Sequence, residues 1–277
     1  MGNILPALEK DVFFAEIRRL LPVVMPKTRL SEIGPSEAPP SKTEPLEIRN
    51  PMVQEEASLD QSILEGLWIH YRELIRWNPR LSLVGPGTAD ELVNRHFGEA
   101  LAALPYLPEA ARVLDVGSGG GFPGLVLAAA CPGLEVFLVE PKQRKVSFLQ
   151  TVIRKIKAAG IALSCHVLDA RVDDPLPVSP ALPQNIDLVT CRALVLGPPR
   201  VRALVRRYPG VRFLLWASLR EKEDVDSALA APAATSLLGT EGTLGLSFGF
   251  ETPYRVGKRI PLADSRYRHI VELMPET

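Results

Sequence analysis

The residues best suited to chemistry in this sequence lie in a glycine-rich segment, residues 115–124, which reads Asp-Val-Gly-Ser-Gly-Gly-Gly-Phe-Pro-Gly. The segment follows a short apolar run, residues 112–116, and opens a stretch with helical character. Glycines let the chain turn through torsions closed to other residues and bring backbone N–H groups against a ligand. This position, after a strand and before a helix, predicts a ligand site at the edge of a parallel sheet.

Two ligands are compatible with this segment. Residues 119–124 match G-x-G-x-x-G, a dinucleotide fingerprint in which Glu140, at the end of the next strand, would bind a ribose. The start of the segment favours a different ligand, because Asp115 followed by glycine at every second position up to Gly121 is the acidic-x-G-x-G-x-G pattern of class I methyltransferases. An acid at the strand tip suits a ligand with an ammonium group, so we expect S-adenosylmethionine rather than a dinucleotide.

The elements that position this segment follow from the pattern after residue 110, where short apolar runs alternate with helical stretches. Such alternation predicts an α/β fold with a doubly wound, mostly parallel sheet. A last strand, residues 267–273, has no helix before it and is expected to be antiparallel. The other predicted strands are residues 112–116, 135–139, 163–168, 186–190 and 211–217, and the predicted helices are 122–131, 142–159, 199–208 and 219–230.

Two further helices are expected ahead of the sheet, over residues 59–77 and 89–104, where apolar residues recur at helical spacing. Residues 26–51 hold six prolines among Ser, Glu and Lys and read as a linker, because they cannot bury enough apolar surface to offset their ordering entropy. The predicted division is an N-terminal extension with a Pro-rich linker, residues 1–58, and a methyltransferase domain, residues 59–277, with a helical cap over residues 59–108.

Charge is balanced overall, with 32 basic and 32 acidic residues in 277, which argues against a strongly basic, nonspecific nucleic-acid binder. Two blocks are nevertheless basic. Residues 142–157 hold six Lys or Arg and no acid, and residues 192–222 hold eight against the single Glu221. These blocks predict either a basic binding face or solvated helix faces. In the second block, Arg206 and Arg207 follow the fourth predicted strand on a helix that is expected to lie beside the ligand site, where they would contact RNA.

Cysteine usage and hydropathy exclude several classes of protein. Cys131, Cys165 and Cys191 are an odd number at spacings that fit neither a disulfide framework nor a metal site, so we expect a reducing compartment and no metal. The longest apolar run in a predicted helix, residues 125–131, is far too short to cross a bilayer, and the N-terminus lacks the features of a secretory signal. A cytoplasmic protein with no membrane contact is expected.

Several stretches carry a resemblance to a known family, and the Gly-Phe-Pro-Gly sequence of residues 121–124 is the most specific of them. The stretches are residues 114–125, Glu140 with Lys145 and Phe148-Leu149, residues 171–173, Arg192-Ala193, Trp77-Asn78 and Arg95-His96. On these residues the sequence resembles the bacterial ribosomal RNA small subunit methyltransferase G (glucose-inhibited division protein B) family. The similarity spans roughly residues 60–273.

The resemblance implies a class I, Rossmann-like methyltransferase that uses S-adenosylmethionine to methylate guanine N7 in 16S ribosomal RNA, with ribosomal RNA or the small ribosomal subunit as partner. It implies that Glu140 holds the ribose hydroxyls, that Val172 and Asp173 flank the adenine, and that Arg192 lies on the methionine and substrate side. The expected cofactor-binding residues are Asp115, Gly117, Ser118, Gly119, Gly121, Phe122, Glu140, Val172, Asp173 and Arg192, and the catalytic candidates are Arg192 and His96.

The sequence departs from the family pattern on the substrate side. It has Ser82-Leu83-Val84 in place of Asn-Leu-Thr, Glu99-Ala100 in place of Asp-Ser, and Ser218 where the family has a lysine. Two alternatives therefore accompany the main prediction. One is a small-molecule methyltransferase, and the other is a catalytically silent RNA- or ribosome-binding protein on the same fold.

The tip of the fourth predicted strand, Thr190-Cys191-Arg192-Ala193, lacks the Asn-Pro-Pro-Tyr sequence typical of enzymes that methylate exocyclic amines. Guanine N7 needs no general base, because it has a free lone pair, so alignment and electrostatics suffice. Because N7 becomes cationic on methylation, an arginine is a poor direct partner for it. Arg192 is therefore assigned to a phosphate, guanine O6 or the cofactor carboxylate.

Three other side chains also keep alternative interpretations. Cys191 is expected to be a buried structural residue rather than a nucleophile. His96 is interpreted as an acid, a phosphate contact or a surface residue, and Phe122 either stacks on a base or closes the loop against the core.

Overall fold

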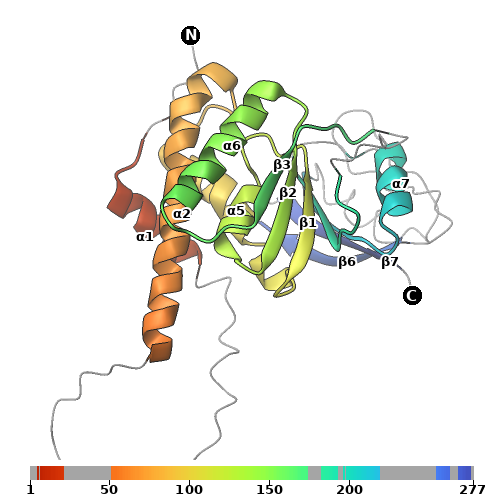
Figure 1. Cartoon of the computed structure of the whole chain (residues 1–277), viewed down its shortest axis with the longest axis horizontal. Coiled ribbons are helices and arrows are strands. Elements are labelled where there is room, and N and C mark those ends of the chain that lie inside the picture. The colour runs from red at the N-terminus through yellow and green to blue at the C-terminus, as the bar shows by residue number, and fades with distance from the viewer. Residues whose placement is uncertain are drawn as a thin grey trace, which may run out of the picture.

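The structure, a computed structural model, describes residues 5, 7–21, 51–173, 182–192, 196, 198–218, 254–262 and 268–275. Its centre is a seven-stranded sheet with the order β3-β2-β1-β4-β5-β7-β6 and helices on both faces (Figure 1). The strands are β1 Ala111–Val116, β2 Leu134–Val139, β3 Cys165–Leu168, β4 Leu188–Arg192, β5 Arg212–Ser218, β6 Tyr254–Pro261 and β7 Arg268–Pro275. The predicted helix 219–230 and nearly all of the predicted linker lie outside the described residues.

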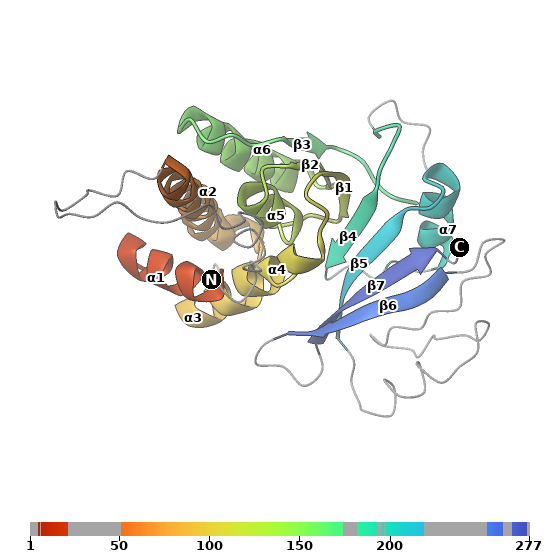
Figure 2. The same ribbon diagram turned by 90° about the horizontal axis from the view of Figure 1, so that it is seen from below.

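Strand pairing makes the sheet mostly parallel. β1 lies between β2 and β4 and pairs with both in parallel, and β3 and β5 extend this parallel core on either side. β7 pairs antiparallel with β5 and with β6, which confirms the antiparallel last strand (Figure 2). Because the strand order reverses between β1 and β4, the carboxyl ends of these two strands flank a crevice where a ligand can bind.

β6 was not predicted, and its sequence explains why. It reads Tyr-Arg-Val-Gly-Lys-Arg-Ile-Pro, with three basic residues, a glycine and a proline among eight positions. Such a composition is typical of an edge strand, which is protected from further pairing by charge and irregularity. The five parallel strands were each predicted to within two residues, because they are short, mainly apolar runs.

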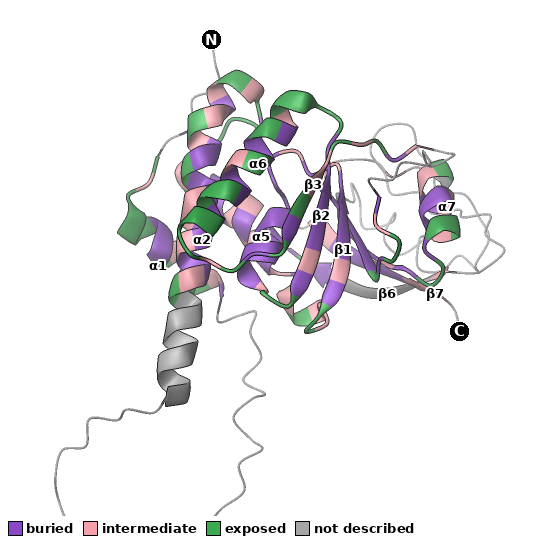
Figure 3. Ribbon diagram, viewed as in Figure 1, coloured by how far each residue is buried: buried purple, intermediate pink, exposed green. Residues whose placement is uncertain are grey.

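Helices cover both faces of the sheet (Figure 1). α5, Gly124–Ala130, and α6, Gln143–Ala158, lie on one face with α2, Pro51–Leu81, outside them, and α7, Pro198–Arg207, covers the other face. All seven residues of α5 are buried, consistent with its place between the sheet and α2 (Figure 3). No helix of the described part of the chain is long and apolar enough to span a membrane.

The second predicted helix of the cap is broken into short pieces. α3, Ala89–Leu92, starts at a capping box in which Thr88 and Glu91 satisfy each other's backbone N–H groups. It continues into a π-helix, η1, Val93–Gly98, then into α4, Glu99–Leu101, and a 3-10 turn, η2, Leu104–Tyr106. π-helical turns inside α-helices are frequent at functional sites, and η1 carries His96.

The folded core reaches ahead of residue 59, where the sequence analysis placed its start. α1, Lys10–Leu20, buries Phe13 and Ile17 completely, and the Phe13 ring lies 5.5 Å from that of Phe97 in the cap. α2 begins at Pro51, so residue 58 falls inside a helix. The division of the chain at that residue stays a prediction, but α1 belongs to the packed structure.

Candidate active site

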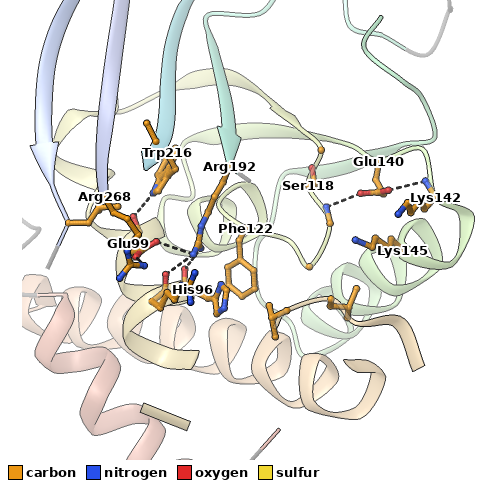
Figure 4. A pocket seen from close by; sticks show the side chains of 18 of the residues that line it. His96, Glu99, Ser118, Phe122, Glu140, Lys142, Lys145, Arg192, Trp216 and Arg268 are labelled. Carbon is orange, nitrogen blue, oxygen red and sulfur yellow. Dashed lines mark hydrogen bonds and ion pairs between the residues drawn. The ribbon is translucent and has the colours of Figure 1, made fainter. Parts of the chain in front are cut away.

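A cavity of about 570 Å³ lies at the carboxyl ends of the parallel strands, where the helical cap meets the sheet (Figure 4). This volume is in the range of small-molecule and cofactor sites. Its lining comes from five places: the glycine loop (Gly117, Ser118, Gly119, Gly120, Phe122), the end of β2 and start of α6 (Glu140, Pro141, Lys142, Lys145), the cap (Leu83, Val84, Arg95, His96, Glu99), the tips of β4 and β5 (Arg192, Trp216, Ala217), and Leu262 with Arg268.

The glycine loop has the backbone conformation that its sequence predicts. Gly117, Gly119 and Gly121 have φ angles of 76°, 53° and 88°, a region that other residues rarely adopt. The N–H groups of Gly117 and Ser118 both donate to the Val139 carbonyl, at 2.9 and 3.1 Å, which ties the loop to β2. The loop therefore presents main chain, without side-chain bulk, to the cavity.

Glu140 supports the loop from the end of β2. Its side chain accepts hydrogen bonds from the N–H groups of Gly119, at 3.0 Å, and Lys142, at 2.9 Å, one on each carboxylate oxygen. The residue is 4% exposed and lines the cavity. A carboxylate oxygen can accept a second hydrogen bond, so Glu140 keeps the capacity to bind a pair of hydroxyl groups.

Asp115 lies beneath the loop and outside the residues that line the cavity. It is completely buried, and its Oδ1 accepts a hydrogen bond from the Thr190 hydroxyl at 2.8 Å. Its Oδ2 has no hydrogen-bond partner among the described residues, and burial raises the pKa of this carboxyl to about 6. A Cβ at Gly124 would lie 2.6 Å from the Asp115 Cβ, so the glycine there allows α5 to pack closely on β1.

His70, on α2, is a site residue that the sequence analysis missed. It is fully buried, and its Nε2 lies 2.7 Å from the Gly120 carbonyl, which requires a proton on that nitrogen. Burial lowers the pKa of His70 to about 4, so the ring is neutral at physiological pH. Its spacing gave a usable signal, because position 70 lies three residues after Leu67 and four before Leu74, on the apolar face of the helix.

Phe122 joins the loop to the cap. Its ring centroid lies 5.0 Å from that of His70, 5.2 Å from that of His96 and 5.1 Å from that of Phe97. The residue is 7% exposed. Phe122 thus closes the loop against the core, one of its two predicted roles, while part of its surface still lines the cavity.

Arg192 lies at the tip of β4 and contacts the cap. Its guanidinium forms an ion pair with Glu99 at 3.0 Å and donates to the carbonyls of Arg95, at 2.9 Å, and His96, at 3.3 Å. Burial lowers the pKa of Arg192 to about 10, so it stays charged at neutral pH. These contacts fasten η1 to the central sheet.

Glu99, one of the departures from the family pattern, is the centre of this cluster. Its side chain is 5% exposed and pairs with both Arg192 and Arg268, and its carbonyl accepts a hydrogen bond from the Trp216 ring N–H at 2.9 Å (Figure 4). Burial raises the pKa of Glu99, against the opposing positive charges of Arg192, Arg268 and Arg95. One acid thus links the cap, β4, β5 and β7.

His96 faces the cavity as a neutral ring. Burial and the positive charge of Arg192 lower the pKa of His96 to about 3. A histidine of such low basicity carries no proton to give as an imidazolium near neutral pH, which disfavours its interpretation as a general acid. It retains one N–H donor, one acceptor nitrogen and an aromatic face.

The structure brings most of the predicted site residues together. Gly117, Ser118, Gly119, Phe122, Glu140, Arg192 and His96 all line the cavity, whereas Asp115, Gly121, Val172 and Asp173 do not. The carbonyl of Val172 accepts a hydrogen bond from Arg200 Nε at 2.8 Å, and Asp173 pairs with Arg200 and Arg171. These two residues follow β3 and are held by α7 rather than by the cavity walls.

The two basic blocks do not each form one face. α6 starts at the cavity with Lys142 and Lys145. Its last turns, with Arg154 and Lys157, lie toward the amino ends of the parallel strands, away from the cavity. α7 returns from the carboxyl end of β4 to the amino end of β5. Its last turn, with Arg206 and Arg207, therefore lies at the amino ends of the strands, opposite the cavity. The expectation that this turn lies beside the site is wrong, because a crossover helix runs antiparallel to its strands.

The remaining sequence candidates are structural. None of the three cysteines is in a disulfide, and Cys191 is buried in the apolar cluster between β4 and α7. Among the described residues, no group of three or more His, Cys, Asp or Glu side chains is arranged to hold a metal ion.

A glycine loop after β1, a buried acid at the end of β2 and a sheet of order 3-2-1-4-5-7-6 with β7 antiparallel define the class I methyltransferase fold. Residues 63–200 match the family model of rRNA small subunit methyltransferase G. The chain belongs to this family.

Individual relatives show the extent of the similarity. The ribosomal RNA small subunit methyltransferase G of Desulfotalea psychrophila is 38% identical over 137 residues, which cover 49% of this chain and 60% of that protein. The Syntrophobacter fumaroxidans protein named ribosomal RNA small subunit methyltransferase G 1 is 30% identical over 177 residues, 62% of this chain and 79% of that protein. A SAM dependent methyltransferase structure from Aquifex aeolicus covers 66% of this chain and 93% of its own, with a TM-score of 0.42 and 14% identity. The chain spans about 60% of the length of the Desulfotalea relative.

Proposed function

We propose that this protein transfers a methyl group from S-adenosylmethionine to N7 of a guanine in 16S ribosomal RNA. The observation that carries the proposal is the joining, in one cavity, of the glycine loop and Glu140 with the family-matching residues Phe122, His96 and Arg192. Ribosomal RNA as the substrate would place the protein in the cytoplasm.

The residues at the loop fit this cofactor. Gly117 and Gly119 leave main chain exposed to the cavity, and Glu140 has acceptor capacity for two ribose hydroxyls. Asp115 is ionised above about pH 6 and lies beneath the loop, so its charge favours a cationic ligand above it without direct contact. When bound there, the cofactor supplies an electrophilic methyl group. Val172 and Asp173 are proposed to flank its adenine.

The side of the cavity formed by the helical cap fits a methyl acceptor that loses no proton in the reaction. Guanine N7 attacks through a free lone pair, so the site needs alignment and a tolerated positive charge rather than a base. His96 suits this role because it is neutral and adds no charge beside a purine that becomes cationic. Arg192 has its charge compensated by Glu99, and it would reach a ligand by exchanging one of its present contacts.

The test is a methyl-transfer assay with labelled cofactor. Purified protein is incubated with 30S subunits, with naked 16S ribosomal RNA, or with a small-molecule extract, and the labelled product is mapped. We expect label on N7 of one guanine, and none with a Gly117→Arg variant that is folded but has lost the cofactor site. Label only in small molecules would support the small-molecule alternative, and RNA binding without transfer would support the silent RNA-binding alternative.

A further inference from the structure

The cavity is strongly basic, although the whole chain is neutral. Five basic side chains and two acidic ones are among the described residues that line it. Both acids are withdrawn from solvent, with Glu99 5% exposed and Glu140 4% exposed. Glu140 is occupied by backbone N–H groups, and Glu99 is shared between Arg192 and Arg268. With five cations against two acids, the lining of the cavity keeps an excess of positive charge.

Among the described residues, three of the cations that line the cavity are not held in an ion pair. Within the described part of the chain, Arg95, Lys142 and Lys145 form no ion pair, and Arg95 and Lys142 are exposed. Away from the cavity, a long basic side chain of the same helix does pair with an acid, as Lys155 does with Glu73. Unpaired cations around a concave site attract an anionic ligand and concentrate it there.

These cations lie on two sides of the cavity. Lys142 and Lys145 are at the start of α6, next to Glu140, and His96 lies across Phe122 from them (Figure 4). Arg95 precedes His96 in η1 and also borders a second, smaller cavity of about 100 Å³ formed with residues 85–87. A polyanion that meets both sides must therefore pass across the mouth of the main cavity.

We propose that an RNA strand crosses this mouth, with the phosphates that flank the target nucleotide contacting Lys142 on one side and Arg95 on the other. This inference rests on the proposed function. The target base turns out of the strand into the cavity, toward Phe122 and His96, because a base that stays stacked in the strand cannot enter a cavity and align its N7 with the methyl donor. Lys145 is left out of this surface, since its ammonium lies close to Gly119 on the cofactor side.

The test compares two double variants that each remove two exposed positive charges. R95Q/K142Q changes the proposed surface, and R154Q/K157Q changes the far end of α6 as a matched control. Dissociation constants for a 16S RNA fragment are measured from 50 to 200 mM salt. Each lost phosphate contact should lower the slope of log K against log salt by about 0.7 to 0.9, so R95Q/K142Q should lose roughly 1.5 in slope and bind roughly ten- to a hundredfold more weakly at 50 mM salt. The control should match the wild type.

Melting temperature and S-adenosylhomocysteine affinity are measured on the same samples and should not change. If the double variant unfolds early, the single variants R95Q and K142Q replace it, each with half the slope effect. An unchanged salt slope in R95Q/K142Q, or an equal loss of slope in R154Q/K157Q, overturns the proposed RNA-binding surface. If the wild type still transfers methyl groups to RNA, the proposed function stands in either case. Wild-type protein that neither binds nor methylates RNA overturns both.

Discussion

Asp115 makes the unfolding free energy of this protein depend on pH in a direction opposite to that of most acidic residues. Its carboxyl is completely buried, one oxygen has no partner among the described residues, and burial raises its pKa from 3.8 to about 6. A raised pKa means that the folded state binds the proton more tightly than the unfolded state does. Stability from this group is therefore fully present below about pH 3.8 and is lost as the pH rises through about 6.

The size of the effect follows from the same values. A rise from 3.8 to about 6 corresponds to about 3 kcal/mol of unfolding free energy once the group is ionised in both states. Between pH 4.5 and pH 7.5, where a folded protein is practical to study, about 2 kcal/mol of this is lost. Asp115→Asn removes the titration but keeps an oxygen that can accept the Thr190 hydrogen bond.

The measurement is urea unfolding of wild type and Asp115→Asn, without ligand, at both pH values. Contributions from His70 and His96, which titrate in the opposite sense, are common to both proteins and cancel in the difference. We expect the wild type to lose about 2 kcal/mol relative to the variant on going from pH 4.5 to pH 7.5. A pH-independent difference, or one that grows in favour of the wild type, would refute the reasoning from burial.

Four further outcomes are expected. Gly117→Arg, at a φ of 76°, should abolish S-adenosylhomocysteine binding in calorimetry while far-ultraviolet circular dichroism stays unchanged. His70→Phe keeps an aromatic ring but leaves the Gly120 carbonyl without its donor, so cofactor affinity should fall roughly tenfold, with partial recovery in His70→Gln; equal affinities would contradict a role in the loop. Phe13→Ala should lower the unfolding free energy by about 3 to 5 kcal/mol, and a change under 1 kcal/mol would show that α1 is peripheral. Charge reversal at Arg206 and Arg207 should leave RNA affinity within about twofold of wild type across a salt series, because this turn lies at the edge opposite the cavity.

The sequence predicted those parts of the fold that local patterns determine. The five parallel strands are apolar runs, and the glycine loop is fixed by conformations that only glycine adopts readily, so both were found without long-range information. β6 was missed because an edge strand carries charged residues that prevent further pairing. These charges interrupt the apolar pattern by which a strand is recognised in a sequence. The role of α1 was missed, because nothing in its own residues indicates that Phe13 packs against Phe97, which lies far along the chain.

The candidate site divides in the same way. Its cofactor side was predicted from one continuous segment and Glu140, whereas the cap side depends on contacts between distant residues. His70 meets Gly120 across 50 positions, and Arg192 meets His96 across 96. The position of the basic blocks relative to the site was misjudged for a related reason. A helix that crosses the sheet carries its first charges at one end of the strands and its last charges at the other end.

The contacts of Arg192 with the carbonyls of Arg95 and His96 make the cap and the cavity energetically dependent on each other. A ligand that accepts a hydrogen bond from this guanidinium replaces one of its contacts with η1. The lost contact destabilises the turn that carries His96, which reduces the net binding free energy of the ligand. Linkage makes this relation reciprocal: whatever repositions η1, including a strand bound against Arg95, must change the affinity of the ligand at Arg192 by the same factor. Substrate and cofactor would then bind with measurable cooperativity, and its sign would report whether η1 is held more firmly with both ligands bound than with one.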